Sequence, residues 1–260
     1  MSMTLETIRA AHARIAPYIV QTPLLRLPAL DAALGCEVYV KAECMQRTGA
    51  FKLRGAMNKI LSLTDAERAR GFVAASSGNH GRAVAYAAQR FGTHACIVMP
   101  ETAPAVKQAA IRALGAELVL CDASERFAVA ARLCAERGAT MVPPFNDEAV
   151  MAGQGTVGLE ILARCPEIDA VVVPVSGGGS LAACPRRSRR PPPRVFSVRS
   201  QLRSRAIRRA CAPAVRCGSS KSARSRMRSS RRSRAMSASR TWRQTPTALR
   251  TWKMRIFSAV

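Results

Sequence analysis

Residues 72–99 read FVAASSGNHGRAVAYAAQRFGTHACIVM. The stretch begins with an apolar run over residues 72–75, passes through a Ser/Gly/Asn turn and continues as an Ala-rich helical segment over residues 79–91, which Gly92 ends. A second apolar run follows at residues 94–99. A strand, a helix and a second strand in this order form the repeating unit of a parallel sheet. This stretch therefore predicts an α/β fold.

The same alternation extends on both sides of this unit. Towards the N-terminus we expect a helix over residues 4–16, a strand over 37–41 and a helix over 51–63. Thr64-Asp-Ala-Glu67 is a capping box that opens a short helix ending at Gly71. Continuous apolar strands between helices indicate parallel sheets with both faces covered. The remaining strands are expected at 117–121, 140–142 and 170–175, and the remaining helices at 103–114, 124–137 and 148–164.

The charge of the chain is unevenly distributed. The 260 residues have a formal net charge of +25, but residues 1–183 hold all 16 acidic residues and only 18 of the 41 basic ones. Residues 184–260 therefore form a basic, low-complexity tail, which we expect to be disordered. Three interpretations stay open for it: an arm that binds nucleic acid, an acid-free solvated linker, or a shifted reading frame. The abrupt change near residue 183 favours the third.

Several classes of protein and site are disfavoured by the sequence. No apolar run reaches the roughly 18–20 residues that span a bilayer. Residues 1–14 lack the apolar core of a signal peptide and include Glu6, so we expect a cytoplasmic protein without a membrane partner. The nine cysteines form no CxxC pair and no Cys/His cluster with zinc spacing, which indicates reduced thiols and no metal site.

The segment from Glu43 to Ala56 reads ECMQRTGAFKLRGA. Lys52 follows a Thr-Gly turn and stands between Phe51 and Leu53, so its amine can be partly desolvated. Desolvation lowers the pKa of a lysine and makes its amine nucleophilic towards an aldehyde. The alternative for Lys52 considered alone is an ordinary solvated lysine at a helix start.

Two further segments stand between a predicted strand and a helix, the place where open α/β sheets bind ligands. Ser76-Ser-Gly-Asn-His-Gly81 can cap a helix, and backbone N–H groups at a helix start can also bind an anion such as a carboxylate. Ser176-Gly-Gly-Gly-Ser180 follows an apolar strand and can curl its N–H groups around a phosphate. The alternative for this glycine segment is a flexible linker.

Together, these three segments resemble the fold-type II enzymes that depend on pyridoxal 5′-phosphate (PLP), the family of threonine dehydratase, serine racemase and cysteine synthase. The resemblance covers most of residues 4–182. It implies a fold like that of the tryptophan synthase β-subunit, with two open twisted parallel-type sheets flanked by helices, here incomplete at the C-terminus. It also implies a large PLP-binding domain from residues 1–47 and 148–183, a small α/β domain from residues 48–147, and a possible homodimer.

The resemblance assigns roles to individual residues. It makes Lys52 the Schiff-base lysine that also moves the α-proton of the substrate, and it places Asn79 on the 3′-oxygen of the cofactor ring. Ser77 matches the acid/base of serine racemases. His80 is interpreted either as a catalytic base or, preferably, as a structural neighbour. The substrate carboxylate loop is Ser76, Ser77, Gly78, Asn79 and His80, and the phosphate loop is Ser176, Gly177, Gly178, Gly179 and Ser180.

The form Phe51-Lys-Leu-Arg-Gly55 resembles threonine/serine dehydratases and serine racemases, whereas cysteine synthases typically have Val-Lys-Asp-Arg. The resemblance therefore implies an ammonia-lyase that converts L-threonine or L-serine to a 2-oxo acid and ammonia. Serine racemisation and hydroxyaspartate dehydration stay open, as does a different class, non-specific binding of nucleic acid through the tail. The tail lacks the acidic metal ligands and the pyridine-nitrogen motif of the family, so we expect the chain as written to lack turnover.

Overall fold

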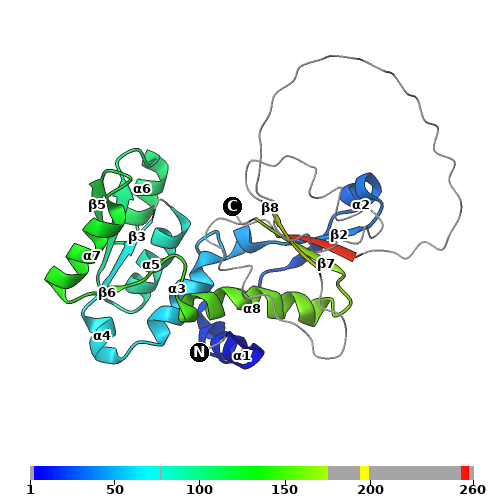
Figure 1. The fold of residues 1–260 in the computed structure, drawn as a ribbon, viewed down its shortest axis with the longest axis horizontal. Coiled ribbons are helices and arrows are strands. Elements are labelled where there is room, and N and C mark those ends of the chain that lie inside the picture. The colour runs from blue at the N-terminus through cyan, green and yellow to red at the C-terminus, as the bar shows by residue number, and fades with distance from the viewer. Residues whose placement is uncertain (1–2, 77, 175–193, 199–252, 258–260) are drawn as a thin grey trace, which may run out of the picture.

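The computed structural model describes residues 3–76, 78–174, 194–198 and 253–257. These residues form two sheets (Figure 1), one of five strands in the order β1-β2-β9-β7-β8 and one of four strands in the order β5-β4-β3-β6. We call the four-stranded sheet with its helices the small lobe and the five-stranded sheet with its helices the large lobe. The prediction of an α/β fold with parallel sheets flanked by helices is confirmed.

The small lobe is built from the strand and helix units that the sequence predicts. All pairs in its sheet are parallel. Helices cover both faces: α5 packs on one face of β3 and β4, while α7 packs on the other. The elements are α4 (Asp65–Ala69), β3 (Phe72–Ala75), α5 (Asn79–Arg90), β4 (Ala95–Pro100), α6 (Ala105–Arg112), β5 (Glu117–Cys121), α7 (Arg126–Arg137) and β6 (Thr140–Met141).

The large lobe combines segments from distant parts of the chain. Its strands are parallel except for β1, which is antiparallel to β2. Strand β9 lies between β2 and β7 and so joins the early strands to the late ones. The elements are η1 (Ala16–Tyr18), β1 (Leu24–Arg26), α2 (Pro28–Leu34), β2 (Glu37–Lys41), η2 (Glu43–Met45), β7 (Ala170–Pro174), β8 (Arg194–Val198) and β9 (Lys253–Phe257).

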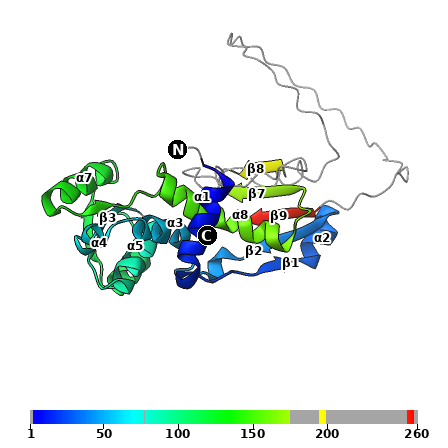
Figure 2. The ribbon, with the colours of Figure 1, turned by 90° about the horizontal axis from the view of Figure 1, so that it is seen from below.

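Three helices, α1 (Leu5–Ile15), α3 (Lys52–Leu61) and α8 (Glu148–Arg164), pack against one another. Helix α3 packs on α5 of the small lobe and on α8, which in turn packs on β7 through Val157 and Ile161. Helix α1 lies across α8, as Figure 2 shows from below. The chain passes from the large lobe into the small lobe through α3 and returns through α8. These two helices therefore connect the parts of the site that the two lobes contribute.

The structure differs from the sequence prediction in several elements. Strand β1, helix α2 and the two 3₁₀ segments were not predicted. In the tail, residues 194–198 and 253–257 are strands of the large sheet, where the sequence analysis traced no strand and expected disorder. The rest of the tail lies outside the described residues. The division into a large and a small domain stays a proposal, which the membership of the two sheets supports.

Within the part of the chain that the structure describes, no helix is both long enough and apolar enough to cross a membrane.

Candidate active site

Lys52 is the first residue of α3 and follows a turn at Gly49, where φ is +73°. A left-handed backbone of this kind favours glycine, so the Thr-Gly pair that the sequence singled out makes this turn. The side chain of Lys52 is half-buried, its Nζ lies 5.3 Å from the centre of the Phe51 ring, and it donates a 2.8 Å hydrogen bond to the carbonyl of Pro144. No carboxylate pairs with this amine among the described residues.

Burial lowers the pKa of Lys52 to about 8, because desolvation disfavours the charged ammonium and no ion pair offsets it. A lysine in water has a pKa of about 10.4, so the neutral, nucleophilic form of Lys52 is more than a hundred times as abundant at neutral pH as it would be there. The sequence prediction that the amine is partly desolvated therefore agrees with the geometry around it.

The loop before α5 is organised by Ser76. Its hydroxyl oxygen accepts hydrogen bonds from the backbone N–H of Gly78 at 3.2 Å and of Gly81 at 2.9 Å, which fixes the turn into the helix. The side chain of Lys107, from the first turn of α6, lies within 3.7 Å of the position that a Cβ atom on Gly78 would take. The hydroxyl of Ser76 is therefore used within the loop, and a side chain at position 78 would meet Lys107.

His80 is buried in the second position of α5. Its Nε2 donates to the carbonyl of Val142 at 2.9 Å, so Nδ1 carries no proton in the neutral ring, and Nδ1 has no hydrogen-bond partner among the described residues. The pKa of His80 is lowered to about 4, mainly by burial and to a smaller extent by the charge of Lys52, while the bond to Val142 opposes the shift. A neutral, anchored ring fits the preferred interpretation of His80 as a structural neighbour, which stays a prediction.

The segment after β6 brings the first two candidate segments together. The Val142 carbonyl accepts from His80 and the Pro144 carbonyl accepts from Lys52, so the start of α3 and the start of α5 are fastened to the same three residues. Asn79, the first residue of α5, stands next to His80 in this arrangement. Ser77 and the glycine segment from Ser176 to Ser180 lie outside the described residues, and β7 ends at Pro174, just before that segment.

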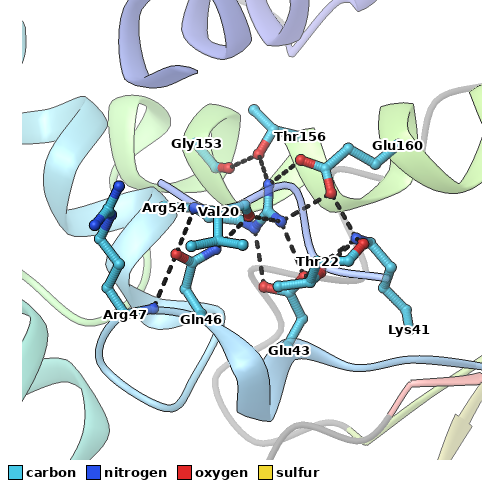
Figure 3. Close-up of polar contacts among 10 residues, drawn as sticks. All are labelled: Val20, Thr22, Lys41, Glu43, Gln46, Arg47, Arg54, Gly153, Thr156 and Glu160. Carbon is cyan, nitrogen blue, oxygen red and sulfur yellow. Dashed lines mark hydrogen bonds and ion pairs between the residues drawn. The ribbon is translucent and has the colours of Figure 1, made fainter. Parts of the chain in front are cut away.

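A buried cluster of charges lies between η2, α3 and α8 (Figure 3), and the sequence did not predict it. The guanidinium of Arg54 donates to both carboxylate oxygens of Glu43, at 2.9 and 3.0 Å, and to both of Glu160, at 2.7 and 2.9 Å. Lys41 also pairs with Glu160 and bonds to Thr22. The four charged side chains are at most 2% exposed, and the charges of two cations and two carboxylates cancel.

This balance explains how the cluster can be buried. Desolvation alone would lower the pKa of Arg54, but its bonds to Glu160 and Glu43 raise that pKa above its ordinary value. For Lys41, desolvation outweighs the carboxylates and lowers the pKa. The sequence held one signal for this cluster, since Glu43 and Arg54 stand at the two ends of the segment around Lys52.

Three buried side chains around the start of α3 have polar atoms with no hydrogen-bond partner among the described residues: Oγ1 of Thr48, Nδ1 of His80 and both amide atoms of Gln154. Thr48 precedes Lys52 by four residues, and Gln154 lies beside Gly55, one turn after Lys52. An unpaired buried polar atom costs about 1–3 kcal/mol, so such atoms suit a polar ligand. A nucleophilic amine at the start of a helix whose neighbourhood holds buried unpaired polar atoms fits an aldehyde cofactor that carries a ring hydroxyl and a phosphate.

A comparison with protein families tests the resemblance that the sequence predicts. Residues 15–249 match the family model described as pyridoxal-phosphate dependent enzyme. The chain belongs to this PLP-dependent family. PLP is therefore the cofactor of the family to which Lys52 and its surroundings belong, and the predicted resemblance is confirmed.

Individual members of the PLP-dependent family are similar to this chain. A serine racemase from Oryza sativa is 47% identical over 180 residues, which are 68% of this chain and 53% of the rice protein. An L-threonine ammonia-lyase from Thermotoga maritima is 47% identical over 182 residues, 69% of this chain and 45% of that protein. The structure of maize serine racemase superposes with a TM-score of 0.72 at 40% identity, covering 76% of this chain and 61% of the maize one. The chain thus spans about half the length of the curated relatives it matches.

Proposed function

We propose that this chain is a PLP-dependent ammonia-lyase that acts on a small hydroxy amino acid, L-threonine or L-serine, and gives a 2-oxo acid and ammonia. The observation that carries the proposal is the half-buried amine of Lys52, whose pKa is about 8 and which, within the described part of the chain, donates to a backbone carbonyl and to no carboxylate. The likeness to an L-threonine ammonia-lyase supports the choice of reaction.

PLP, when bound, supplies an aldehyde for an amine and an electron sink for the carbanion that forms when the α-proton leaves. Lys52 would hold the cofactor and then, as a free amine, take the α-proton at Nζ. A base with a pKa of about 8 is unprotonated for a useful fraction of the time near neutral pH and can return its proton easily. The Pro144 carbonyl would orient this amine through its hydrogen bond.

The start of α5 would bind the substrate carboxylate. Backbone N–H groups at a helix N-terminus favour an anion, and the Ser76 hydroxyl holds this turn in shape through two hydrogen bonds. His80 is neutral around pH 7, so it would form no ion pair with the substrate carboxylate, which the helix N-terminus would bind instead. Asn79 and Ser77, and the glycines from 177 to 179, keep the roles that the resemblance assigns to them as part of this proposal.

The test uses the full chain incubated with PLP and reduced with borohydride. We expect one stable adduct, located by peptide mapping at Lys52, and its loss in Lys52→Ala. Lys59→Ala is the matched control, because Lys59 is on the same helix but pairs with Asp147 at 2.8 Å, and this variant should keep the adduct. Ammonia release from L-threonine or L-serine then tests turnover, which the composition of the tail leads us to expect this chain as written to lack. An adduct without turnover would indicate an inactive relative that still binds PLP, and the absence of any adduct would refute the proposal.

A second candidate function is racemisation of serine, which the likeness to the rice and maize serine racemases favours. The two reactions differ in their products from L-serine. Chiral chromatography that detects D-serine would support racemisation, whereas pyruvate and ammonia without D-serine would support the lyase. A homodimer and a cytoplasmic location stay part of the proposal.

A further inference from the structure

One member of the buried charge cluster, Arg54, lies on the same helix as Lys52 of the candidate site. Successive residues in an α-helix are rotated by about 100° around the helix axis. Two residues that are two positions apart are therefore rotated by about 200° and lie on nearly opposite sides of the helix. Lys52 donates to the Pro144 carbonyl on one side of α3. Arg54 projects towards Glu43 and Glu160 on the other side, as Figure 3 shows. Arg54 does not contact the Lys52 amine, but the two side chains extend from the same turn of the same helix.

Arg54 is held from two sides. Glu43 comes from η2, in the segment before α3, and Glu160 comes from the C-terminal half of α8. Each carboxylate takes two hydrogen bonds from the guanidinium, and the planar fork of arginine fixes both distance and angle in such pairs. A fifth bond, at 3.2 Å, goes to the hydroxyl of Thr156, which lies one turn earlier than Glu160 on α8. The guanidinium thus fixes both the position of the first turn of α3 along the helix axis and its rotation around that axis.

The backbone of this turn is also in close contact with α8. A Cβ atom on Gly153 would lie 2.3 Å from the carbonyl oxygen of Arg54, and one on Gly55 would lie 2.8 Å from the carbonyl of Val150. The two helices therefore meet backbone to backbone at Arg54. The close contact blocks movement of the turn towards α8. If the Arg54 clamp is lost, the turn is therefore displaced along the helix axis or around it.

We propose that Arg54 is a positioning residue for Lys52: clamped between Glu43 and Glu160, it holds the first turn of α3 so that the Lys52 amine stays half-buried against the Pro144 carbonyl. This inference rests on the proposed role of Lys52. Hydrogen bonds weaken steeply when donor and acceptor move apart by about an ångström, so a small shift of the turn would release the amine to water. His80, across the site on α5, is the described titratable group that senses the charge of Lys52.

The test measures the Lys52 amine directly and without PLP. The full chain is labelled with a trace of acetic anhydride over a range of pH, and the labelling of the Lys52 peptide is compared with that of the exposed Lys107 by mass spectrometry. In the parent chain we expect Lys52 to titrate at about 8. In Arg54→Met we expect the titration to move at least one unit upward, towards the value of a lysine in water, with a roughly tenfold loss of reactive amine near neutral pH.

Asn58→Ala is the matched control. Asn58 is also buried on α3, where it bonds to Arg14 and to the carbonyl of Ala149, each at 2.7 Å, so its removal loosens the same helix without touching the clamp. We expect this variant to lose stability and to keep the Lys52 titration. A shift in Asn58→Ala as large as that in Arg54→Met would overturn the proposal, since any disturbance of α3 would then suffice.

Glu160→Gln covers the case in which Arg54→Met does not fold. Glutamine keeps the shape of the side chain and one acceptor. Because it removes a negative charge, its direct electrostatic effect on the Lys52 pKa is downward, so the smaller upward shift that we expect in Glu160→Gln reports a displacement of the turn and not the changed charge. An unchanged Lys52 titration in a folded Arg54→Met or Glu160→Gln protein overturns the proposal. If PLP forms no adduct with the parent chain, the proposed function fails, and this labelling result still shows separately whether Arg54 sets the position of the amine.

Discussion

The amine of Lys52 donates a 2.8 Å hydrogen bond to the carbonyl of Pro144, which lies 92 residues further along the chain. A neutral acceptor of this kind orients an amine without stabilising its charge as a carboxylate would. The lowered pKa of Lys52 is a consequence, because burial acts on the amine without an ion pair to oppose it. The following predictions concern this amine, its neighbours and the helices that carry them.

The reaction of Lys52 with PLP should depend on pH around 8. The pKa is lowered, so the amine is neutral and reactive above about pH 8 and protonated below it. We expect the initial rate of adduct formation, followed by borohydride trapping, to rise with pH up to about 8 and then to level off. A rate that continues to climb to about pH 10, as for a lysine in water, would contradict the assigned burial.

His80 should make stability depend on pH. Its pKa is about 4 in the folded chain and about 6.5 when unfolded, so the unfolded chain binds more protons between these values. The stabilisation is complete above about pH 6.5 and is lost as the pH falls towards 4, by roughly 3 kcal/mol in all. In His80→Gln, whose amide can still donate to Val142, this part of the dependence should disappear from urea unfolding curves. Identical pH profiles for the variant and the parent would count against a buried neutral ring.

Gln154→Met should separate stability from cofactor binding. Both amide atoms of Gln154 are buried without a partner among the described residues, so an apolar side chain of similar size should stabilise the chain free of PLP by about 1 kcal/mol. If these atoms serve the cofactor, the same change should weaken PLP binding. Thermal unfolding and PLP titration measure the two effects, and a variant that is less stable yet binds PLP normally would refute this reasoning.

Gly153→Ala should destabilise the contact between α3 and α8. Alanine is favoured over glycine inside a helix by roughly 1 kcal/mol, so propensity alone predicts a gain in stability. The added methyl group would, however, lie 2.3 Å from the Arg54 carbonyl, and overpacking of this kind costs about 1–3 kcal/mol. We expect the steric cost to prevail, with a lower midpoint in thermal unfolding. An unchanged or higher midpoint would show that the two helices can separate freely.

The sequence predicted the small lobe well because its signals are local. The apolar run at residues 72–75 and the capping box at Thr64 and Glu67 depend on neighbouring residues and appear in the structure as predicted. The run predicted as a strand at residues 94–99 forms β4, shifted by one residue. Strand β1 and helix α2 were missed because three and seven residues are too few to show a period. The Thr-Gly turn and Lys52 were identified from the segment itself.

The charge cluster could not be predicted in the same way. Glu43, Arg54 and Glu160 lie on three elements, η2, α3 and α8, and Glu160 lies 106 residues after Arg54. Nothing in the pattern around Glu160 distinguishes it from a solvated glutamate on a helix. Only the packing of α3 on α8 shows that these charges are buried and paired. The roles of Ser77 and of the segment from Ser176 to Ser180 stay predictions.

The order of strands in the large sheet has a consequence for biosynthesis. Strand β9 pairs with β2 on one side and β7 on the other, although its residues, 253–257, are the last described part of the chain. A ribosome would therefore have released β1, β2 and β7 long before the strand that unites them appears. The small lobe, whose strands follow one another within 70 residues, can assemble while translation continues. The pairing of β2 with β9 joins residues far apart in the sequence, such as Glu37 and Lys253, so we expect the large sheet to form more slowly than the small lobe.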